Sequence, residues 1–136
     1  MASVHKQVTV DAAAEEVWSV ISDFAAGPLR MASGFVTGSL LDGEGVREVR
    51  FADGTVVRER FVASDEESRR IVYAVVDGVD GLVHDNASMT VAPDGEGRCR
   101  LVWTRDVLPH GLAPGFERAM EAGSQAIART LGGGRT

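Results

Sequence analysis

Apolar and polar residues alternate along the segment between Gly45 and Gly78, as they do in half-buried β-strands. Ala52-Asp53-Gly54 is a hairpin-turn signal inside this segment, and the acidic run Ser64–Ser68 marks a second turn. The pattern predicts three consecutive antiparallel strands, over Val46–Phe51, Thr55–Val62 and Arg70–Val76. Four further strands are predicted outside this segment, over Val4–Val10, Phe35–Leu41, His84–Ala92 and Cys99–Val107.

Two segments have the apolar spacing of amphipathic helices. The first is Ala12–Phe24, with Asp11 as its candidate N-cap, and the second is Pro114–Leu131. Between them, Leu29–Gly34 is a short irregular or helical segment after Gly27-Pro28. The order of elements predicts an α+β fold with about seven strands in a mainly antiparallel sheet. We expect one domain over residues 1–136.

Side-chain parity predicts the register of the first hairpin. A three-residue turn over residues 52–54 pairs Arg47 with Glu59, on the face that also carries Phe51. A two-residue turn would place Glu48 beside Glu59, and two like charges side by side are unfavourable. We therefore expect a cross-strand ion pair between Arg47 and Glu59 on the concave face of the sheet.

The same parity predicts which other side chains face inward. They are Val49, Val57, Phe61, Ile71, Tyr73, Val75, Asp77, Asp85, Ala87, Met89, Val91, Leu101, Trp103 and Arg105. Val72 and His84 are predicted to face outward. The terminal helix has Met120 and the small residue Gly123 on its apolar stripe. Inward charges opposite small residues predict a hydrated internal cavity, the usual form of a binding site.

Composition and charge exclude several classes of protein. The formal net charge of -6 argues against nucleic acid or an anionic membrane as partner. No apolar run reaches the roughly 20 residues that span a bilayer, and no signal-peptide core is present. Cys99 is the single cysteine, which excludes an internal disulfide. We expect a soluble cytoplasmic protein, monomeric or homodimeric, and the excess of arginine over lysine is typical of a GC-rich bacterial gene.

Several segments together resemble the START-like, Bet v 1-like superfamily of helix-grip proteins, and within it the bacterial polyketide cyclase/dehydratase branch. These segments are VTVDAAAEEVWSVISDF (8–24), GVREVRFADGTVVRERF (45–61), MTVAPDGEG (89–97) and LVWT (101–104), with the spacing of Asp65, Arg70 and Tyr73. The resemblance covers nearly the whole chain. It implies a curved seven-stranded antiparallel sheet wrapped around a long C-terminal helix, with two short helices after the first strand and a cavity between sheet and helix.

Residues 45–88 also resemble the plant abscisic acid receptors of the same superfamily. This resemblance implies that the pocket is lined by Val49, Phe51, Val57, Glu59, Tyr73, Val75, Leu82, Asp85 and Ala87. Two departures matter: the tight turn over residues 52–54 replaces the receptors' gate motif, and Asp85 stands where relatives often have an aromatic residue. A more acidic pocket is therefore expected, and a hormone-gated switch is not.

The charged inward residues are candidates for chemistry, and each has a structural alternative. Arg47 and Glu59 either orient a ligand and transfer protons or only stiffen the sheet. Asp85 is a candidate general base, or a solvated carboxylate at the cavity mouth. Arg105 either holds an acidic ligand group or pairs with Asp85 or Asp106.

The candidate catalytic residues are Glu59, Asp85 and Arg47. The candidate ligand-binding residues are Val49, Phe51, Val57, Tyr73, Val75, Leu82, Ala87, Trp103, Arg105, Met120 and Gly123. Tyr73 and Trp103 are more typical of core or cavity wall than of chemistry. The three histidines and one cysteine have no metal-ligand spacing, so neither a metal nor another cofactor is expected.

Two functions stay open from the sequence. The first is a cofactor-independent, cyclase/dehydratase-like enzyme that binds a hydrophobic, oxygenated small molecule, shapes it and transfers protons. The alternative is a non-catalytic protein that binds or transports a lipid or other small molecule. A chaperone-activator type of interaction domain is a weaker third hypothesis, because no exposed apolar stripe supports it.

Overall fold

The computed structural model describes residues 2–132. The elements in chain order are β1 (Ala2–Val10), α1 (Ala14–Ile21), α2 (Gly27–Met31), β2 (Val36–Leu41), β3 (Val46–Phe51), β4 (Val56–Asp65), β5 (Arg70–Asp77), β6 (His84–Pro93), β7 (Cys99–Leu108), the short 3₁₀ helix η1 (His110–Leu112) and α3 (Ala113–Gly132).

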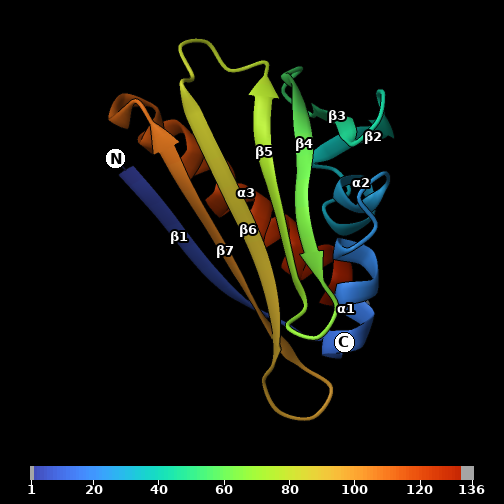
Figure 1. Cartoon of the computed structure of the whole chain (residues 1–136). Coiled ribbons are helices and arrows are strands. Elements are labelled where there is room, and N and C mark those ends of the chain that lie inside the picture. The colour runs from blue at the N-terminus through green and yellow to red at the C-terminus, as the bar shows by residue number, and fades with distance from the viewer. Residues whose placement is uncertain (1, 133–136) are drawn as a thin grey trace.

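The strands form one antiparallel sheet in the order β1-β7-β6-β5-β4-β3-β2. The sheet curves around α3, which crosses its concave face, and α1 and α2 cover the side nearest β2 (Figure 1). Apolar side chains from the sheet, α1 and α3 form the core between these layers. This is the α+β helix-grip architecture that the sequence predicts, including the two short helices after the first strand.

The β3–β4 hairpin has the predicted register. Arg47 lies opposite Glu59, and the backbone N–H of Phe51 donates to the carbonyl oxygen of Thr55. The turn contains Gly54 at a φ of 92°, a conformation that glycine adopts without the steric cost of a Cβ. The prediction of a three-residue turn is confirmed.

The helix boundaries differ from the predictions. The N-cap of α1 is Ala13 and has no side-chain cap hydrogen bond, so the prediction of Asp11 as N-cap is wrong. Glu15 and Glu16 lie in the first turn instead, where the positive end of the helix dipole favours acidic groups. The helix ends at Ile21, three residues short of the prediction. Pro28 lies in the first turn of α2, where a backbone N–H has no acceptor within the helix, so the lack of an N–H in proline costs no hydrogen bond.

Register shifts in the pairing of β4 with β5 change which residues face inward. One shift falls between Arg58 and Glu59, so that Asp77 pairs with Arg58 and is exposed, contrary to the prediction. A second follows Phe61, whose ring packs edge-on against Phe24 while 38% of the residue stays exposed. β-Bulges of this kind insert an extra residue and invert the parity beyond it.

Val72, predicted to face outward, is 5% exposed but does not belong to the core cluster. It lies opposite Ala63 on β4 and Ser88 on β6. A residue in a central strand can thus be shielded by its neighbours without entering the core.

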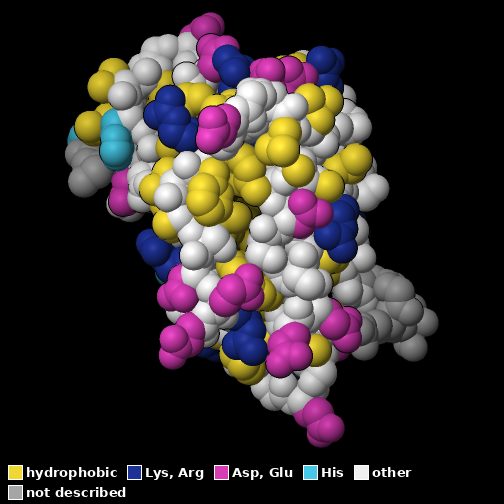
Figure 2. Space-filling model, turned by 45° about the vertical axis from the view of Figure 1, so that its right-hand side comes forward, with side chains coloured by type: hydrophobic (Ala, Val, Ile, Leu, Met, Phe, Trp, Pro, Cys, Tyr) yellow, Lys and Arg dark blue, Asp and Glu magenta, His cyan; other side chains and the backbone are white. Residues whose placement is uncertain are grey.

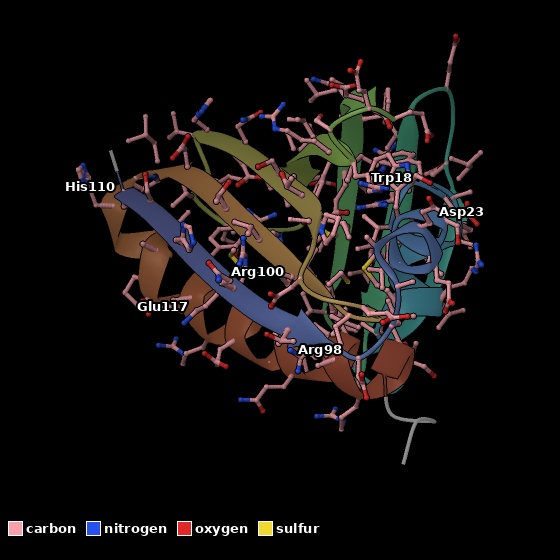
Figure 3. All side chains as sticks on the ribbon, turned by 90° about the horizontal axis from the view of Figure 1, so that it is seen from below. Trp18, Asp23, Arg98, Arg100, His110 and Glu117 are labelled. Atoms are coloured by element: carbon pink, nitrogen blue, oxygen red, sulfur yellow. The ribbon has the colours of Figure 1, made fainter. Side chains whose placement is uncertain are left out.

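Side-chain contacts connect the layers. The indole N–H of Trp18, on α1, donates to Glu66 in the β4–β5 turn at 2.7 Å. On the opposite side, Lys6 of β1 forms ion pairs with Glu117 and Glu121 of α3. Figure 3 shows Trp18 and Glu117 on these two separate sides, with Glu117 on the outside of α3. No helix within residues 2–132 is long and apolar enough to cross a bilayer.

Candidate ligand-binding site

A cavity of about 630 Å³ lies between the concave face of the sheet and the first half of α3. This volume falls within the range of roughly 300–1,000 Å³ that is typical of small-molecule sites. The lining residues are Phe35, Phe51, Ala52, Asp53, Thr55, Val57, Glu59, Tyr73, Val75, Val79, Trp103, Arg105, Leu112, Gly115, Phe116, Arg118 and Ala119. Most of these side chains are apolar, and the charged ones are few.

At one end the cavity is lined by residues of the β3–β4 turn, the β5–β6 loop and the start of α3, and we call this end the mouth. These three segments lie at the top of Figure 1. Exposed residues on this rim include Asp53 and Arg118. Hydrophobic side chains are concentrated in the upper half of the face in Figure 2, among charged ones. The lining of the cavity is therefore mostly apolar, and charged residues are exposed at its edge.

Glu59 is held by Arg47 at the base of this cavity. Nε and Nη2 of Arg47 both lie 2.8 Å from Oε1 of Glu59, and Nη1 donates to the carbonyl oxygen of Phe24 at 3.0 Å. The guanidinium also lies over the ring of Phe24, 4.4 Å from its centroid. Because both contacts from Arg47 go to Oε1, they leave Oε2 of Glu59 for another partner.

A second buried pair joins Arg105 to Asp85. Nε of Arg105 lies 2.7 Å from Oδ1 of Asp85, although its N–H is not directed at that oxygen, so the contact is an ion pair without a well-formed hydrogen bond. Oδ2 accepts the backbone N–H of Val75 at 2.8 Å. Burial raises the pKa of Asp85, and the positive charge of Arg105 opposes that rise. The contact uses Nε of Arg105, and Arg105 also lines the larger cavity.

The ring of Tyr73 lies near the arginine of each pair. Its oxygen accepts the indole N–H of Trp103 at 2.9 Å, so the hydroxyl proton can be donated elsewhere. Burial raises the pKa of Tyr73 to about 12, which keeps the hydroxyl protonated at neutral pH. The guanidinium carbons of Arg47 and Arg105 lie 5.0 and 5.7 Å from the centre of its ring.

A smaller cavity of about 50 Å³ lies deeper in the molecule. Its walls include Met31 of α2, Val49 of β3 and Ile127 of α3. Five residues line both cavities: Phe35, Phe51, Glu59, Tyr73 and Trp103. The two cavities are therefore neighbours with a shared wall.

The predicted site residues fall into three groups. Those that line the larger cavity are Phe51, Val57, Glu59, Tyr73, Val75, Trp103 and Arg105. Those that line only the smaller one are Arg47, Val49 and Gly123. Those that line neither are Leu82, Asp85, Ala87 and Met120. Asp85 thus reaches the larger cavity only through Arg105.

Sequence reasoning missed part of the wall. Three lining residues lie where apolar periodicity gives no signal. Phe35 is the first residue of a predicted strand, and Val79 and Leu112 lie between predicted elements. Phe116 belongs to the apolar stripe of the terminal helix, and this spacing could have identified it as a lining residue. Arg118 lies off this apolar stripe and is exposed, yet it also lines the cavity.

Among residues 2–132, no group of three or more histidine, cysteine, aspartate or glutamate side chains is arranged to hold a metal ion. The buried polar groups that line the cavity are the carboxylate of Glu59, the hydroxyl of Tyr73 and the guanidinium of Arg105. Together they can accept one proton and donate hydrogen bonds to an oxygen atom.

Comparisons with solved structures return the same fold. The protein XoxI of Bacillus cereus superposes with a TM-score of 0.83 at 19% identity, over 96% of each chain. A Thermobifida fusca protein superposes with a TM-score of 0.72 at 26% identity, over 96% of this chain and 95% of the other. Norcoclaurine synthase of the plant Thalictrum flavum, solved with a transition-state analogue, superposes with a TM-score of 0.68 at 20% identity, over 99% of this chain and 96% of the other.

Curated protein sequences give no match to this chain. The family model described as "Polyketide cyclase / dehydrase and lipid transport" matches residues 1–132. With the helix-grip fold and the cavity described above, this match over nearly the whole sequence identifies the chain as a member of the polyketide cyclase/dehydrase and lipid transport family.

Proposed function

We propose that the protein binds a hydrophobic, oxygenated small molecule in the larger cavity and catalyses a proton-transfer reaction on it, such as a cyclisation or a dehydration. The observation that carries this proposal is the position of Glu59. Its Oε1 is fixed by Arg47, while Oε2 is left for a partner at the edge of an apolar cavity. A carboxylate held in this way is pre-oriented as a general base.

The hydrogen-bond donors of the cavity complement this base. Tyr73 and Arg105 line the same cavity as Glu59, and the Tyr73 hydroxyl and the Arg105 guanidinium are hydrogen-bond donors. They donate to a carbonyl oxygen of the ligand, while Oε2 of Glu59 accepts a proton from the carbon next to that carbonyl. The electrons of the broken C–H bond move toward the carbonyl oxygen, where the donors stabilise the negative charge.

The completion of the reaction depends on the ligand. In a dehydration, the carbon–oxygen bond to a hydroxyl group breaks, and protonated Glu59 returns its proton to give water. In a cyclisation, the carbon that lost its proton attacks a second carbonyl group of the same molecule, and the proton goes to the new alkoxide. In both cases the cavity holds a flexible molecule in one folded conformation, which lowers the entropic part of the barrier.

Arg47 acts as a positioning residue in this proposal, since its contacts go to Glu59 and to the backbone of Phe24. Asp85 positions Arg105 in the same way. That an enzyme with this fold, norcoclaurine synthase, binds a transition-state analogue supports the proposal at the level of the fold only.

A non-catalytic carrier is the second candidate function. Lipid transport is part of the family's description, and the lining of the cavity is mostly apolar. The same cavity would then hold a lipid-like molecule and release it unchanged. The two functions share the site and differ in whether Glu59 exchanges a proton with the ligand.

The first experiment is native mass spectrometry of the purified protein, followed by solvent extraction and identification of any co-purified small molecule. The second measures binding and turnover of that molecule, or of its unreacted precursor, with wild-type protein and with Glu59→Gln. As an enzyme, the variant is expected to lose about 10²–10⁴-fold in kcat while its Kd stays within a few-fold. Unchanged turnover would remove Glu59 as the base, and recovery of the ligand unaltered from the wild type would favour the carrier.

A further inference from the structure

Four rings separate the larger cavity from the smaller one. They belong to Phe35, Phe51, Tyr73 and Trp103, each of which lines both cavities, and we call them the aromatic partition. The larger cavity lies on the side of the mouth, and the smaller one lies on the side of α2. The depth to which a ligand can enter is therefore set by this group of side chains.

Trp103 is the central member of the aromatic partition and is held at both ends. Its Nε1 donates to the Tyr73 hydroxyl at 2.9 Å. Its far edge packs on α3 at Gly123, where a Cβ would lie 3.0 Å from Cζ3 and 3.2 Å from Cη2. The indole thus spans the interior from β5 to α3.

Gly123 also supports the other half of the partition. The same Cβ position lies 3.2 Å from Cε2 of Phe35, so the bare backbone of the helix accommodates both rings. Phe35 in turn packs edge-on against Phe51, with the ring centroids 5.3 Å apart. The contacts therefore continue from Tyr73 to Phe51, and the rings of Trp103 and Phe35 both pack against Gly123.

We propose that Trp103 determines the length of ligand that the protein accepts, by closing the inner end of the larger cavity. This inference rests on the proposed binding of a small molecule in that cavity. The space behind Trp103, about 50 Å³ and lined by Met31, Val49, Met89 and Ile127 among others, is too small to hold a ligand alone. It becomes an extension of the larger cavity once the indole is removed.

The experiment uses a homologous series of straight-chain methyl ketones as probes, because their single carbonyl oxygen matches the donors of the cavity. Binding is measured by displacement of anilinonaphthalene sulfonate and confirmed by calorimetry. In the wild type, each added methylene is expected to lower Kd about fourfold until the chain reaches Trp103, after which the gain stops. The chain length at which the gain stops is the quantity to compare between variants.

Two variants move this limit in opposite directions. Trp103→Leu removes the indole and is expected to extend the fourfold gains to longer chains. Gly123→Ala forces the rings of Trp103 and Phe35 away from α3 and is expected to shorten the limit, and alanine favours the helix, so the fold is retained. Leu101→Val is the matched control, because Leu101 is fully buried, lies two residues from Trp103 on the same face of β7 and lines neither cavity.

A limit that is the same in the wild type and both variants would overturn the role of Trp103 and leave the proposed binding intact. The role of Trp103 is equally overturned if Leu101→Val moves the limit as far as Trp103→Leu does. If no ketone binds the wild type, the proposed binding fails, and this inference fails with it.

Discussion

Arg47 directs two of its nitrogens, Nε and Nη2, at a single oxygen of Glu59, Oε1, each at a distance of 2.8 Å. The two residues are 4% and 7% exposed, so the pair is buried. A buried ion pair is costly to break because removal of one partner leaves the other charged and unpaired. The pair therefore matters for stability whatever it does for the ligand.

The first prediction concerns the stability that depends on this pair. Arg47→Met is expected to lower the free energy of unfolding by about 3–5 kcal/mol, because Glu59 is left buried without its partner. The double variant Arg47→Met/Glu59→Leu is expected to recover most of that loss. Urea denaturation of the variants measures both changes.

The control for this prediction lies on the outer face of the same strand. Arg50 forms an ion pair with Glu48 at 2.9 Å, but its side chain is 59% exposed. Arg50→Met is expected to change the free energy of unfolding by less than about 1 kcal/mol, because solvent screens the pair. If Arg47→Met and Arg50→Met lower the free energy of unfolding by the same amount, the prediction is wrong, because burial of the Arg47 pair would then make no difference.

The second prediction concerns the ionisation of Tyr73, the single tyrosine of the sequence. Its pKa is raised to about 12, mainly by burial, so absorbance titration of tyrosinate reports this one group. The folded protein is expected to titrate near pH 12, and the protein in denaturant near its ordinary value of 10.0. Because folding raises the pKa of Tyr73, this residue contributes to the free energy of unfolding. The contribution is complete below pH 10 and is lost as the pH rises through about 12. A folded-state midpoint near 10, with circular dichroism unchanged, would contradict the burial of the hydroxyl.

The third prediction concerns Asp85 and acid stability. Burial raises its pKa above the ordinary value of 3.8, so the folded state binds more protons than the unfolded state between the two pKa values. Its contribution to stability is therefore present below pH 3.8 and falls as the pH rises through the folded-state pKa. The difference in unfolding free energy between wild type and Asp85→Asn, followed across this range, is expected to show that fall.

Other carboxylates act in the opposite direction, which is why the difference between the two proteins is the useful quantity. The pKa values of Asp53 and Asp65 are lowered, mainly by hydrogen bonds from Thr55 and Ser68, so their contributions are lost as the pH falls. Both groups are unchanged in Asp85→Asn and cancel from the difference. A difference that does not vary with pH would contradict a raised pKa for Asp85.

The fourth prediction separates charge from geometry at Arg105. Arg105→Lys keeps a positive charge near Asp85 but loses the planar fork that lies 4.5 Å from the ring centre of Phe116. The affinity for a methyl ketone is expected to fall about tenfold, whereas thermal stability changes little. Calorimetry with the ketone and with an alkane of the same length measures the effect, and equal losses for both would assign Arg105 to packing alone.

Much of the fold follows from local patterns. The register of Arg47 opposite Glu59 could be predicted because the turn length, the side-chain parity and the like charge of Glu48 all favour one pairing. The partner of Arg105 could not be chosen between Asp85 and Asp106. The structure assigns it to Asp85, while Asp106 accepts a hydrogen bond from Ser3 at 2.7 Å.

The limits of the cavity were not predictable for a different reason. Met120 faces inward as expected but fills the core, whereas Arg118 reaches the mouth. Which of these helix residues lines a cavity depends on where α3 lies along the sheet. That placement results from packing contacts such as those of Gly123 with Trp103 and Phe35, and no single-sequence periodicity reports them.

The pairing of β1 with β7 has a consequence for the order in which the molecule is made. Ala2 lies opposite Val107, so β1 stays unpaired until β7 has been synthesised. Trp103, Arg105 and all of α3 also belong to this last part. Contacts between residues so far apart in sequence are slow to form, since a long loop must close first. The cavity is therefore among the last features to be completed, and a nascent chain that lacks α3 has no enclosed space for a ligand.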